Sequence, residues 1–198
     1  SKLGLKPVGV SFHVGSQQKS ITSWQKAINI AAKVYKNLFT QGMHMNFLNI
    51  GGGFPTSYSE YNTDIRKYSK QILLTIDKKF GINKPKNIIS EPGRFLVADA
   101  GVIEAEIILV AKKSSGNVRS WVYIDVGRYN GLAETEGEAI KYLIKVANKH
   151  KQVKEKNFIL AGPSCDSHDI IYEKAACYLP YNIGIGDKIR IFSAGAYT

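Results

Sequence analysis

The chain has 198 residues, of which 44% are hydrophobic and 22% charged, a composition typical of a globular protein with one domain or two small ones. No apolar run approaches the ~18 residues that a membrane helix needs, so no membrane association is expected. The formal charge of +11 comes from 22 Lys and five Arg spread along the sequence, without the Arg-rich stripe and interleaved aromatic residues of a nucleic-acid-binding surface. Two cysteines are too few for a disulfide framework, and we expect free thiols in a reducing, cytoplasmic compartment.

The first hundred residues alternate apolar, strand-like runs with amphipathic segments of helical spacing. Strands are predicted at residues 8–14, 45–50 and 87–90. The first helix is predicted to start at Ser20 or Thr22 and to stop near Gly42. The second is predicted over residues 63–80, with Gly81 as its end. Their buried faces are predicted to consist of Ala27, Ile30, Ala31, Val34, Tyr35 and Leu38 in the first helix and Ile65, Tyr68, Ile72, Leu73 and Ile76 in the second. This alternation with short connections predicts a parallel sheet covered by helices.

Beyond residue 100 the pattern changes to strands separated by turns. Strands are predicted at residues 102–111, 120–125, 158–161, 175–179 and 188–193. Only residues 134–147 have the pattern of a helix, and the densest basic run, residues 141–156, is typical of a solvated surface. The sequence therefore predicts an α/β domain over residues 1–100 and a mostly antiparallel β domain over residues 101–198.

The α/β part has too few strand–helix units to close on itself. Three units would leave the edges of a parallel sheet uncovered, whereas a closed (β/α) barrel takes eight units and ~250 residues. The chain also begins without methionine, directly before a strand. We therefore expect that a larger N-terminal portion either precedes this sequence or was lost from the gene. A (β/α) barrel and an open α/β sheet both place functional residues after the carboxyl ends of their strands, where the motifs of this chain lie.

Two motifs follow the second and third predicted strands. The turn Gly51-Gly52-Gly53 is either a simple tight turn or one that lets backbone N–H groups approach a phosphate. Arg94 favours the phosphate, because a guanidinium pairs with it in a bidentate geometry. Glu91 is a surface acid, an ion-pair partner of Arg94, or a carboxylate that keeps a pyridine nitrogen protonated and its ring electron-poor. His13 is either structural or lies against such a ring. A flat cofactor with a phosphate at one end and a basic nitrogen at the other is the leading hypothesis.

Five segments occur in a fixed order along the whole chain. They read GVSFHVGS (9–16), IGGGFP (50–55), EPGR (91–94), GPSCD (162–166) and GAYT (195–198). Together they resemble the pyridoxal-phosphate-dependent basic amino acid decarboxylases of the alanine-racemase-like fold, fold type III. Residues 123–127 and 131–135 are similar to the bacterial-type ornithine and lysine/ornithine enzymes of that family. The resemblance implies that residues 1–100 are the C-terminal part of a (β/α)8 TIM-like barrel, followed by the mostly antiparallel β domain.

The resemblance also implies a role for each matched residue, with pyridoxal 5'-phosphate as the cofactor and no metal. The implied catalytic residues are His13, which would stack on the cofactor ring, and Cys165, which would protonate the carbanion left by carbon dioxide. Glu91 would contact the pyridine nitrogen, and Asp166 would hold the distal ammonium of the substrate. The phosphate would be bound by Ser16, Gly53, Gly93, Arg94 and Tyr197, with Gly51 and Gly52 in the same cofactor-binding turn. A thiol suits proton donation because an unperturbed pKa near ~8.5 keeps it protonated at neutral pH.

The implied reaction is decarboxylation of a basic amino acid, most of all of ornithine to putrescine in polyamine biosynthesis, and also of lysine. In this family the loop with Cys165 and Asp166 enters the active site of the partner subunit, which implies a homodimer with shared sites. Diaminopimelate decarboxylase is the nearest alternative, and it normally carries Cys-Glu-Ser where this chain has Cys165-Asp166-Ser167. Animal-type ornithine enzymes have a second substrate-binding acid in the region of residues 141–145, which here contains none, as in the bacterial-type relatives.

The sequence lacks the segment resembling Ala-Val-Lys-Ala-Asn in which the family carries its cofactor-anchoring lysine. None of the 22 lysines follows a strand in a matching context, so the chain alone is not expected to catalyse decarboxylation. Two alternatives stay open: a catalytically inactive decarboxylase-like protein that binds or inhibits a partner, and a decayed gene product. The retained Cys165 and Asp166 argue against the first. Cys177, by contrast, is predicted to be a small buried hydrophobe.

Overall fold

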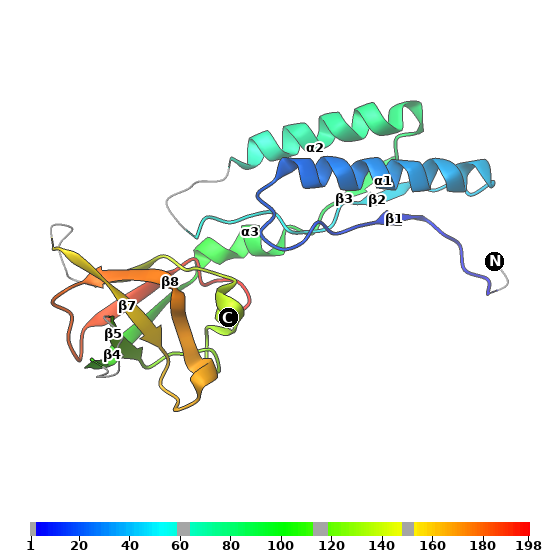
Figure 1. Cartoon of the computed structure of the whole chain (residues 1–198). Coiled ribbons are helices and arrows are strands. Elements are labelled where there is room, and N and C mark those ends of the chain that lie inside the picture. Colours follow the sequence, from blue (N-terminus) through cyan, green and yellow to red (C-terminus); the bar gives the residue numbers. More distant parts are fainter. Residues whose placement is uncertain (1–2, 59–63, 113–118, 148–152) are drawn as a thin grey trace. The chain divides into compact units, whose positions relative to one another are not determined.

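The computed structural model describes residues 3–58, 64–112, 119–147 and 153–198. The chain forms two compact units, each with its own hydrophobic core. The first, called here the α/β unit, consists of Ser1–Thr56 and Asn62–Leu96, and the second, the β unit, of Ser57–Tyr61 and Val97–Thr198 (Figure 1). The division of the whole protein into a barrel portion over residues 1–100 and a β domain over residues 101–198 stays a prediction.

The α/β unit is a parallel sheet with helices on one face. Its strands are β1 (Gly9–Ser11), β2 (Phe47–Asn49) and β3 (Asn87–Ile89), paired in the order β1-β2-β3. The helices α1 (Ile21–Thr40) and α2 (Ile65–Phe80) pack against each other on the same face of the sheet (Figure 1). The short helices η1 (Gly81–Asn83) and α3 (Gly93–Val97) flank β3. The predicted parallel sheet and its helices are confirmed, although each strand is only three residues long.

The core of the α/β unit shows where the predicted helix faces were wrong. In α1 the buried stripe runs through Trp24, Ile28, Ala31 and Tyr35, which follow the spacing of one helix face. Ile30 and Val34, predicted to be buried, are 62% and 42% exposed. Leu73 of α2 is likewise 48% exposed, beside the buried Ile72. Each of these three residues is next to a buried residue in the sequence. One residue is a rotation of about 100° around the helix axis, so its side chain points away from the buried face.

The helix ends follow the local chemistry of the chain. Ser20 precedes α1 in extended backbone, but its hydroxyl bonds with the Thr22 hydroxyl at 2.7 Å instead of capping the helix. The Asp64 carboxylate accepts from the backbone N–H of Arg66 and caps α2, while the predicted start at residue 63 lies outside the described residues. Gly42 and Gly81 have positive φ angles of 79° and 54° and end the two helices, as predicted.

The β unit is a six-stranded sheet in the order β6-β9-β4-β5-β7-β8. Within the described residues of this sheet every pairing is antiparallel except that of β5 with β7. The strands are β4 (Val102–Ala111), β5 (Ser120–Ile124), β6 (Ile144–Val146), β7 (Glu155–Ala161), β8 (Ile170–Pro180) and β9 (Lys188–Phe192). The larger core cluster of the β unit lies around Ile107, Val122, Leu160 and Ile189, and a smaller one consists of Trp121, Ile159 and Ala161.

The predicted helix over residues 134–147 is wrong. The segment forms a short 3-10 helix, η3 (Ala133–Glu138), and then the strand β6. Gly137 and Glu138 both have φ of 58°, a left-handed conformation that ends a helix. The Glu138 carboxylate accepts from three successive backbone N–H groups of β8, those of Glu173, Lys174 and Ala175, at 2.6–2.7 Å. These bonds hold the segment against the edge strand as a loop.

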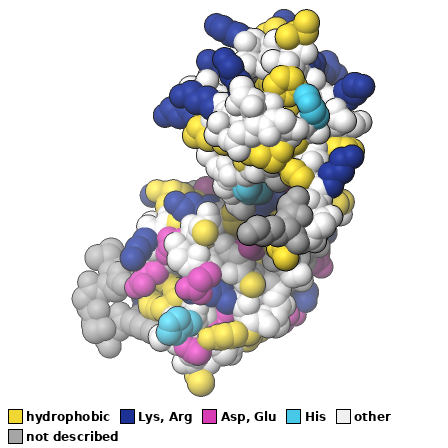
Figure 2. Space-filling view, turned by 90° about the vertical axis from the view of Figure 1, so that its right-hand side faces the viewer, with side chains coloured by type: hydrophobic (Ala, Val, Ile, Leu, Met, Phe, Trp, Pro, Cys, Tyr) yellow, Lys and Arg dark blue, Asp and Glu magenta, His cyan; other side chains and the backbone are white. Residues whose placement is uncertain are grey.

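Surface features of the described residues are ordinary. Lys and Arg side chains are spread singly or in small groups over the face of the α/β unit seen in Figure 2. Lys141 and Lys145 of the predicted basic run are exposed, and residues 148–152 of that run lie outside the described residues. Among the helices that the structure describes, none has both the length and the apolar character to cross a bilayer.

Candidate cofactor and substrate site

The carboxyl ends of β1, β2 and β3 meet at one edge of the parallel sheet, and the loops that follow them bond to one another. Phe12 N–H donates to the Asn49 carbonyl at 3.1 Å, which continues the β1–β2 pairing past the strands. Glu91 N–H donates to the Gly51 carbonyl at 2.8 Å, which joins the β2 and β3 loops. The three loops that carry the predicted cofactor residues of the α/β unit are therefore held side by side.

The glycine turn is packed so closely that side chains are excluded from it. A Cβ atom on Gly52 would lie 2.4 Å from the Glu91 carbonyl oxygen and 3.4 Å from His13 Nε2. A Cβ atom on Gly53, whose φ is 89°, would lie 2.2 Å from the Gly15 carbonyl oxygen. Real Cβ contacts of 2.2–2.4 Å to backbone oxygen do not occur, so both positions require glycine. The turn presents bare backbone between the β1 and β3 loops.

His13 and Ser16 lie on the β1 loop beside this turn. Nδ1 of His13 accepts from the Gly15 N–H at 2.9 Å, which fixes the orientation of the exposed imidazole next to Gly52. Ser16 follows Gly15 in an exposed turn. Gln18 N–H donates to the Gly53 carbonyl at 2.9 Å and ties this turn to the glycines. Both predicted residues are thus brought to the glycine turn.

The Glu91 carboxylate is oriented by a residue that the sequence interpretation missed. The Asn49 side chain accepts from Gly51 N–H through Oδ1 at 2.9 Å and donates through Nδ2 to Glu91 Oε1 at 2.5 Å. Asn49 therefore links the glycine turn to the predicted pyridine-binding acid. Nothing in the local sequence distinguishes Asn49 from Asn46 of the same predicted strand. Gly93 and Arg94 begin α3, and Arg94 is 8% exposed.

In the β unit, Cys165 and Asp166 lie on the loop between β7 and β8, and both are exposed. Asp166 Oδ1 accepts from the His168 N–H at 2.9 Å, and Oδ2 accepts from the Tyr129 hydroxyl at 2.8 Å. The hydrogen bond from the His168 backbone, followed by that from Tyr129, lowers the pKa of Asp166. The same bond to Asp166 raises the pKa of the Tyr129 hydroxyl. Asp166 is thus an ionised carboxylate on an exposed loop, suited to a cationic ligand.

Residues 1–98 match the family model described as pyridoxal-dependent decarboxylase, pyridoxal binding domain. The lysine/ornithine decarboxylase of Selenomonas ruminantium is 29% identical over 197 residues, which are 98% of this chain and 47% of that protein. The diaminopimelate decarboxylase of Helicobacter pylori is 32% identical over 194 residues, which are 98% of this chain and 45% of that protein. The solved structure of SrLDC in complex with PLP and cadaverine is similar with a TM-score of 0.81 and 28% identity, over 100% of this chain and 49% of that one. The chain belongs to the pyridoxal-dependent decarboxylases.

The cofactor of this decarboxylase family is pyridoxal phosphate. The chain spans about half the length of the curated relatives that it matches. Those relatives include enzymes for lysine or ornithine and for diaminopimelate, so they establish the decarboxylase family without selecting one substrate. Within the described residues, no cluster of three His, Cys, Asp or Glu side chains has the arrangement of a metal site.

The remaining predicted residues are placed in the β unit. Tyr197 is 65% exposed and has a φ of 60°, and its contact with the cofactor phosphate stays a prediction. Cys177 is a free thiol, 5% exposed, and burial raises its pKa to about 12. Cys177 is therefore a buried apolar side chain, as predicted, whereas the free thiol of Cys165 is exposed.

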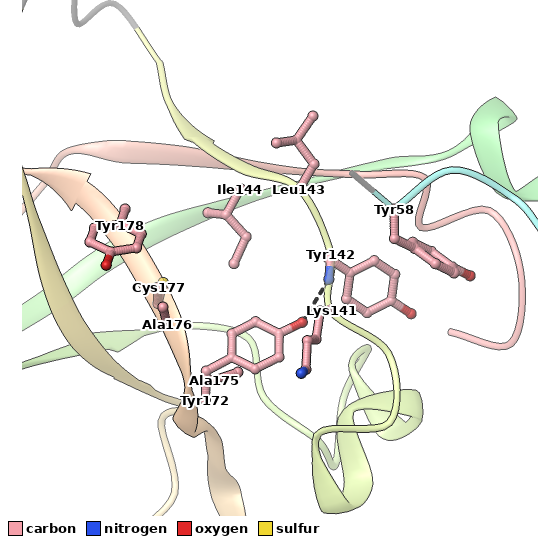
Figure 3. A pocket seen from close by; sticks show the side chains of 10 residues that line it. All are labelled: Tyr58, Lys141, Tyr142, Leu143, Ile144, Tyr172, Ala175, Ala176, Cys177 and Tyr178. Atoms are coloured by element: carbon pink, nitrogen blue, oxygen red, sulfur yellow. Dashed lines mark hydrogen bonds between the residues drawn. The ribbon is translucent and has the colours of Figure 1, made fainter. Parts of the chain in front are cut away.

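Residues 141–144 line a cavity in the β unit. The cavity has a volume of about 380 Å³ and is walled by four tyrosines, Lys141 and apolar side chains (Figure 3). Tyr172 joins two parts of the wall, because its hydroxyl accepts from Tyr142 N–H at 2.8 Å and donates to the Ile140 carbonyl at 2.9 Å. No carboxylate is among the described residues that line it, and Lys141 is its one charged side chain.

Proposed function

We propose that the edge formed by the β1, β2 and β3 loops binds pyridoxal phosphate, and that the protein carrying this chain decarboxylates ornithine or lysine to its diamine. The single observation that carries this proposal is the bare backbone of Gly52 between the His13 imidazole and the Glu91 loop. Such a cradle accepts a flat ring or a phosphate where a side chain would block both. The chemistry of the surrounding donors fits this cofactor.

The phosphate would be held by the polar and glycine positions of the cradle and by the guanidinium. In the α/β unit these are Ser16, Gly53, Gly93 and Arg94. Backbone N–H groups and a guanidinium are the usual phosphate donors of proteins, and phosphate sites follow neighbouring strands in (β/α) barrels. The connected β2 and β3 loops support a shared phosphate site of this kind.

The ring would lie between the exposed imidazole of His13 and the Glu91 carboxylate. Pyridoxal phosphate, when bound, supplies an electron-poor ring that takes up the electron pair released as carbon dioxide leaves the substrate Cα. Glu91 would keep the ring nitrogen protonated, and Asn49 would hold the Glu91 carboxylate in place for this purpose. Cys165 would return a proton to Cα, and Asp166 would bind the distal ammonium.

We further propose that the three-stranded sheet is a portion of a closed (β/α)8 barrel. The edge strand β3 is bordered by an apolar cavity of about 340 Å³ between α2 and α3. Leu73 and Ile89, which line it, are 48% and 43% exposed. Large apolar side chains along an unpaired strand edge favour coverage by a further strand–helix unit.

The exposed loop with Cys165 and Asp166 supports a homodimer in which each active site takes this loop from the partner. A short carboxylate side chain at residue 166 favours a substrate whose far end is a simple ammonium over diaminopimelate, whose far end also carries a carboxylate. The absence of an acid from the cavity wall at residues 141–144 agrees with the bacterial-type branch. Cytoplasmic location and a role in polyamine biosynthesis belong to the same proposal.

The test is release of carbon dioxide and amine by the intact protein that carries this chain, with ornithine, lysine and meso-diaminopimelate assayed side by side. We expect diamine from ornithine or lysine, and a fall of about tenfold or more in kcat/KM for Asp166→Asn, because a charge-assisted hydrogen bond is lost. Cys165→Ala should keep cofactor binding but divert turnover to abortive products. Preference for diaminopimelate would refute the substrate assignment. Cofactor binding without any turnover would identify an inactive homologue.

A further inference from the structure

The exposed loop of Cys165 and Asp166 is fastened from beneath by one buried carboxylate. Asp169 ends the short helix η4 (Ser167–Asp169) and is 2% exposed. Its Oδ1 accepts from the Arg128 N–H at 2.8 Å, and its Oδ2 accepts from the Ser164 N–H at 3.0 Å. The two oxygens thus join residues 162–169, which follow β7, to residues 125–130, which follow the neighbouring strand β5.

Two glycines make room for this carboxylate. A Cβ atom on Gly127 would lie 2.2 Å from Asp169 Oδ1, and a Cβ atom on Gly162 would lie 2.4 Å from the same oxygen. Gly162 N–H also donates to the Asp169 carbonyl at 2.8 Å, which closes the loop at its base. The chain therefore excludes side chains from both segments at the point where the buried acid enters.

Arg128 supports the same loop with its side chain, which is 12% exposed. Its Nη1 donates to the His168 carbonyl at 2.6 Å, and its Nη2 donates to the Thr135 carbonyl at 3.0 Å. The residue that gives its backbone N–H to Asp169 thus also binds the loop directly. Buried groups with charge-assisted hydrogen bonds on both sides are costly to displace.

Each of the two segments that Asp169 joins carries one residue of an exposed hydrogen-bonded pair, Tyr129 and Asp166. Tyr129 directly follows Arg128, and its hydroxyl donates to Asp166 Oδ2 at 2.8 Å. Asp166 lies three residues before Asp169 and accepts through Oδ1 from His168 N–H. The His168 ring nitrogen Nδ1 lies 3.3 Å from the same oxygen. The direction of the Asp166 carboxylate is therefore set by Tyr129 and His168, whose positions both depend on Asp169 and Arg128.

We propose that Asp169 is the positioning residue of the substrate-recognition loop, and that with Arg128 it locks the two segments so that Tyr129 fixes Asp166 for a primary ammonium. This inference rests on the proposed function, in which Asp166 binds the distal end of the substrate. A carboxylate already held in place loses little conformational entropy when an ammonium binds, so the lock raises discrimination for a ligand of that chemistry.

Asp169→Asn is the informative variant, because it keeps the side-chain size and removes the charge. Hydrogen exchange should show the amides of Arg128 and Ser164 exchanging about tenfold faster, since hydrogen bonds to a charged group are weakened. Core amides of β5 and β7, such as those of Val122 and Leu160, should keep their rates. In an NMR titration the pKa of Asp166 should rise toward its ordinary value. Tyr129→Phe should raise it by less, because it removes one donor and leaves the His168 N–H in place. Added to Asp169→Asn, it should change the pKa of Asp166 by less than it does alone, because the two changes act on the same contact.

The matched control is Asp187→Asn, which removes a carboxylate from the same unit at the turn where Asp187 accepts from Gly184 N–H at 2.8 Å. It should leave the exchange of Arg128 and Ser164 and the titration of Asp166 unchanged. If Asp169→Asn does not fold, Arg128→Lys takes its place, and it should raise the pKa of Asp166, because a single ammonium cannot bond both carbonyls in the fork geometry of a guanidinium. The amides of residues 128 and 164 keep the Asp169 carboxylate as their acceptor in this variant, so their exchange should change less.

Two results would overturn the proposal. One is an unchanged exchange rate at Arg128 and Ser164 together with an unchanged titration of Asp166. The other is a uniform rise in exchange over β5 and β7 with the thiol of Cys177 becoming reactive, which would make Asp169 a general stability residue. These measurements use the chain without cofactor or substrate. If the protein releases no diamine, the proposed function is therefore refuted, whereas the measured effect of Asp169 on the Asp166 loop remains valid.

Discussion

The two units of this chain prepare their sites in opposite ways. At the strand ends of the α/β unit, Gly52 and Gly53 have no side chains, so their backbone lies within contact distance of the neighbouring loops. In the β unit the chain adds a buried charge, Asp169, to hold an exposed one, Asp166. Under the proposed function, the glycine turn would bind a phosphate or ring with shaped backbone, whereas a small cation would bind a side chain that needs its own support.

The largest effect should come from filling the cradle. Gly52→Ala puts a Cβ atom 2.4 Å from the Glu91 carbonyl oxygen, so the β2 and β3 loops must separate. We expect a loss of about 1–3 kcal/mol in the free energy of unfolding, measured in urea, because overpacking forces backbone shifts. Gly184→Ala is the matched control, because nothing lies within 4 Å of its Cβ position and its φ is not positive. Equal stability of the two variants would show that the turn is not tightly packed.

A smaller effect is expected at the supports of the β unit. Burial raises the pKa of Glu138, but three backbone hydrogen bonds from β8 and the charge of Lys141 outweigh this and lower it. A carboxyl whose pKa is lower in the folded state stabilises the fold fully above its unfolded pKa, near ~4.3, and loses this contribution as the pH falls through the folded value. Glu138→Gln should therefore cost about 1 kcal/mol at pH 7, and the difference from the unchanged chain should shrink below pH ~4.

Urea unfolding of both proteins at a series of pH values measures this difference. Glu155→Gln is the control, because that carboxylate has no hydrogen bond or ion pair among the described residues and should show no such dependence. A difference between the Glu138 variant and the unchanged chain that stayed constant down to pH ~3 would contradict the assignment, since a protonated carboxyl can no longer accept three N–H donors equally well.

Sequence pattern was sufficient where one residue type has one physical use. The glycines at Gly51–Gly53 predicted a turn of bare backbone after β2, and the structure has one, because only glycine permits such close backbone approach. The roles of the acid and the guanidinium at residues 91 and 94 stay predictions. The sequence pattern did not predict that Ile30 and Leu73 are exposed. Several apolar residues lie near the buried face of each helix, and only packing decides which of them are buried. The pattern also failed for residues 134–147, because Gly137 and the bonds of Glu138 to β8 override a weak helical pattern.

The supporting residues were invisible for a different reason. Asn49, Arg128 and Asp169 act through partners up to 42 residues away, as in the bond from Asn49 to Glu91. Local sequence contains no periodicity or spacing that reveals such a partner. An acid directly before an apolar strand, such as Asp169 before β8, has the sequence pattern of a surface residue. Asp169 is nevertheless buried, because Gly127 and Gly162 leave room for its carboxylate in the folded chain.

The central claim is that the glycine cradle of the α/β unit binds the phosphate end of a vitamin B6 compound. The most direct measurement compares binding of pyridoxine 5'-phosphate and pyridoxine to this chain by equilibrium dialysis, because neither carries the aldehyde that would react with its lysines. We predict that the phosphate ester binds at least about tenfold more tightly, as charge-assisted contacts require, and that Gly52→Ala abolishes the difference. Equal binding of the two compounds, or an undiminished preference in Gly52→Ala, would contradict the account.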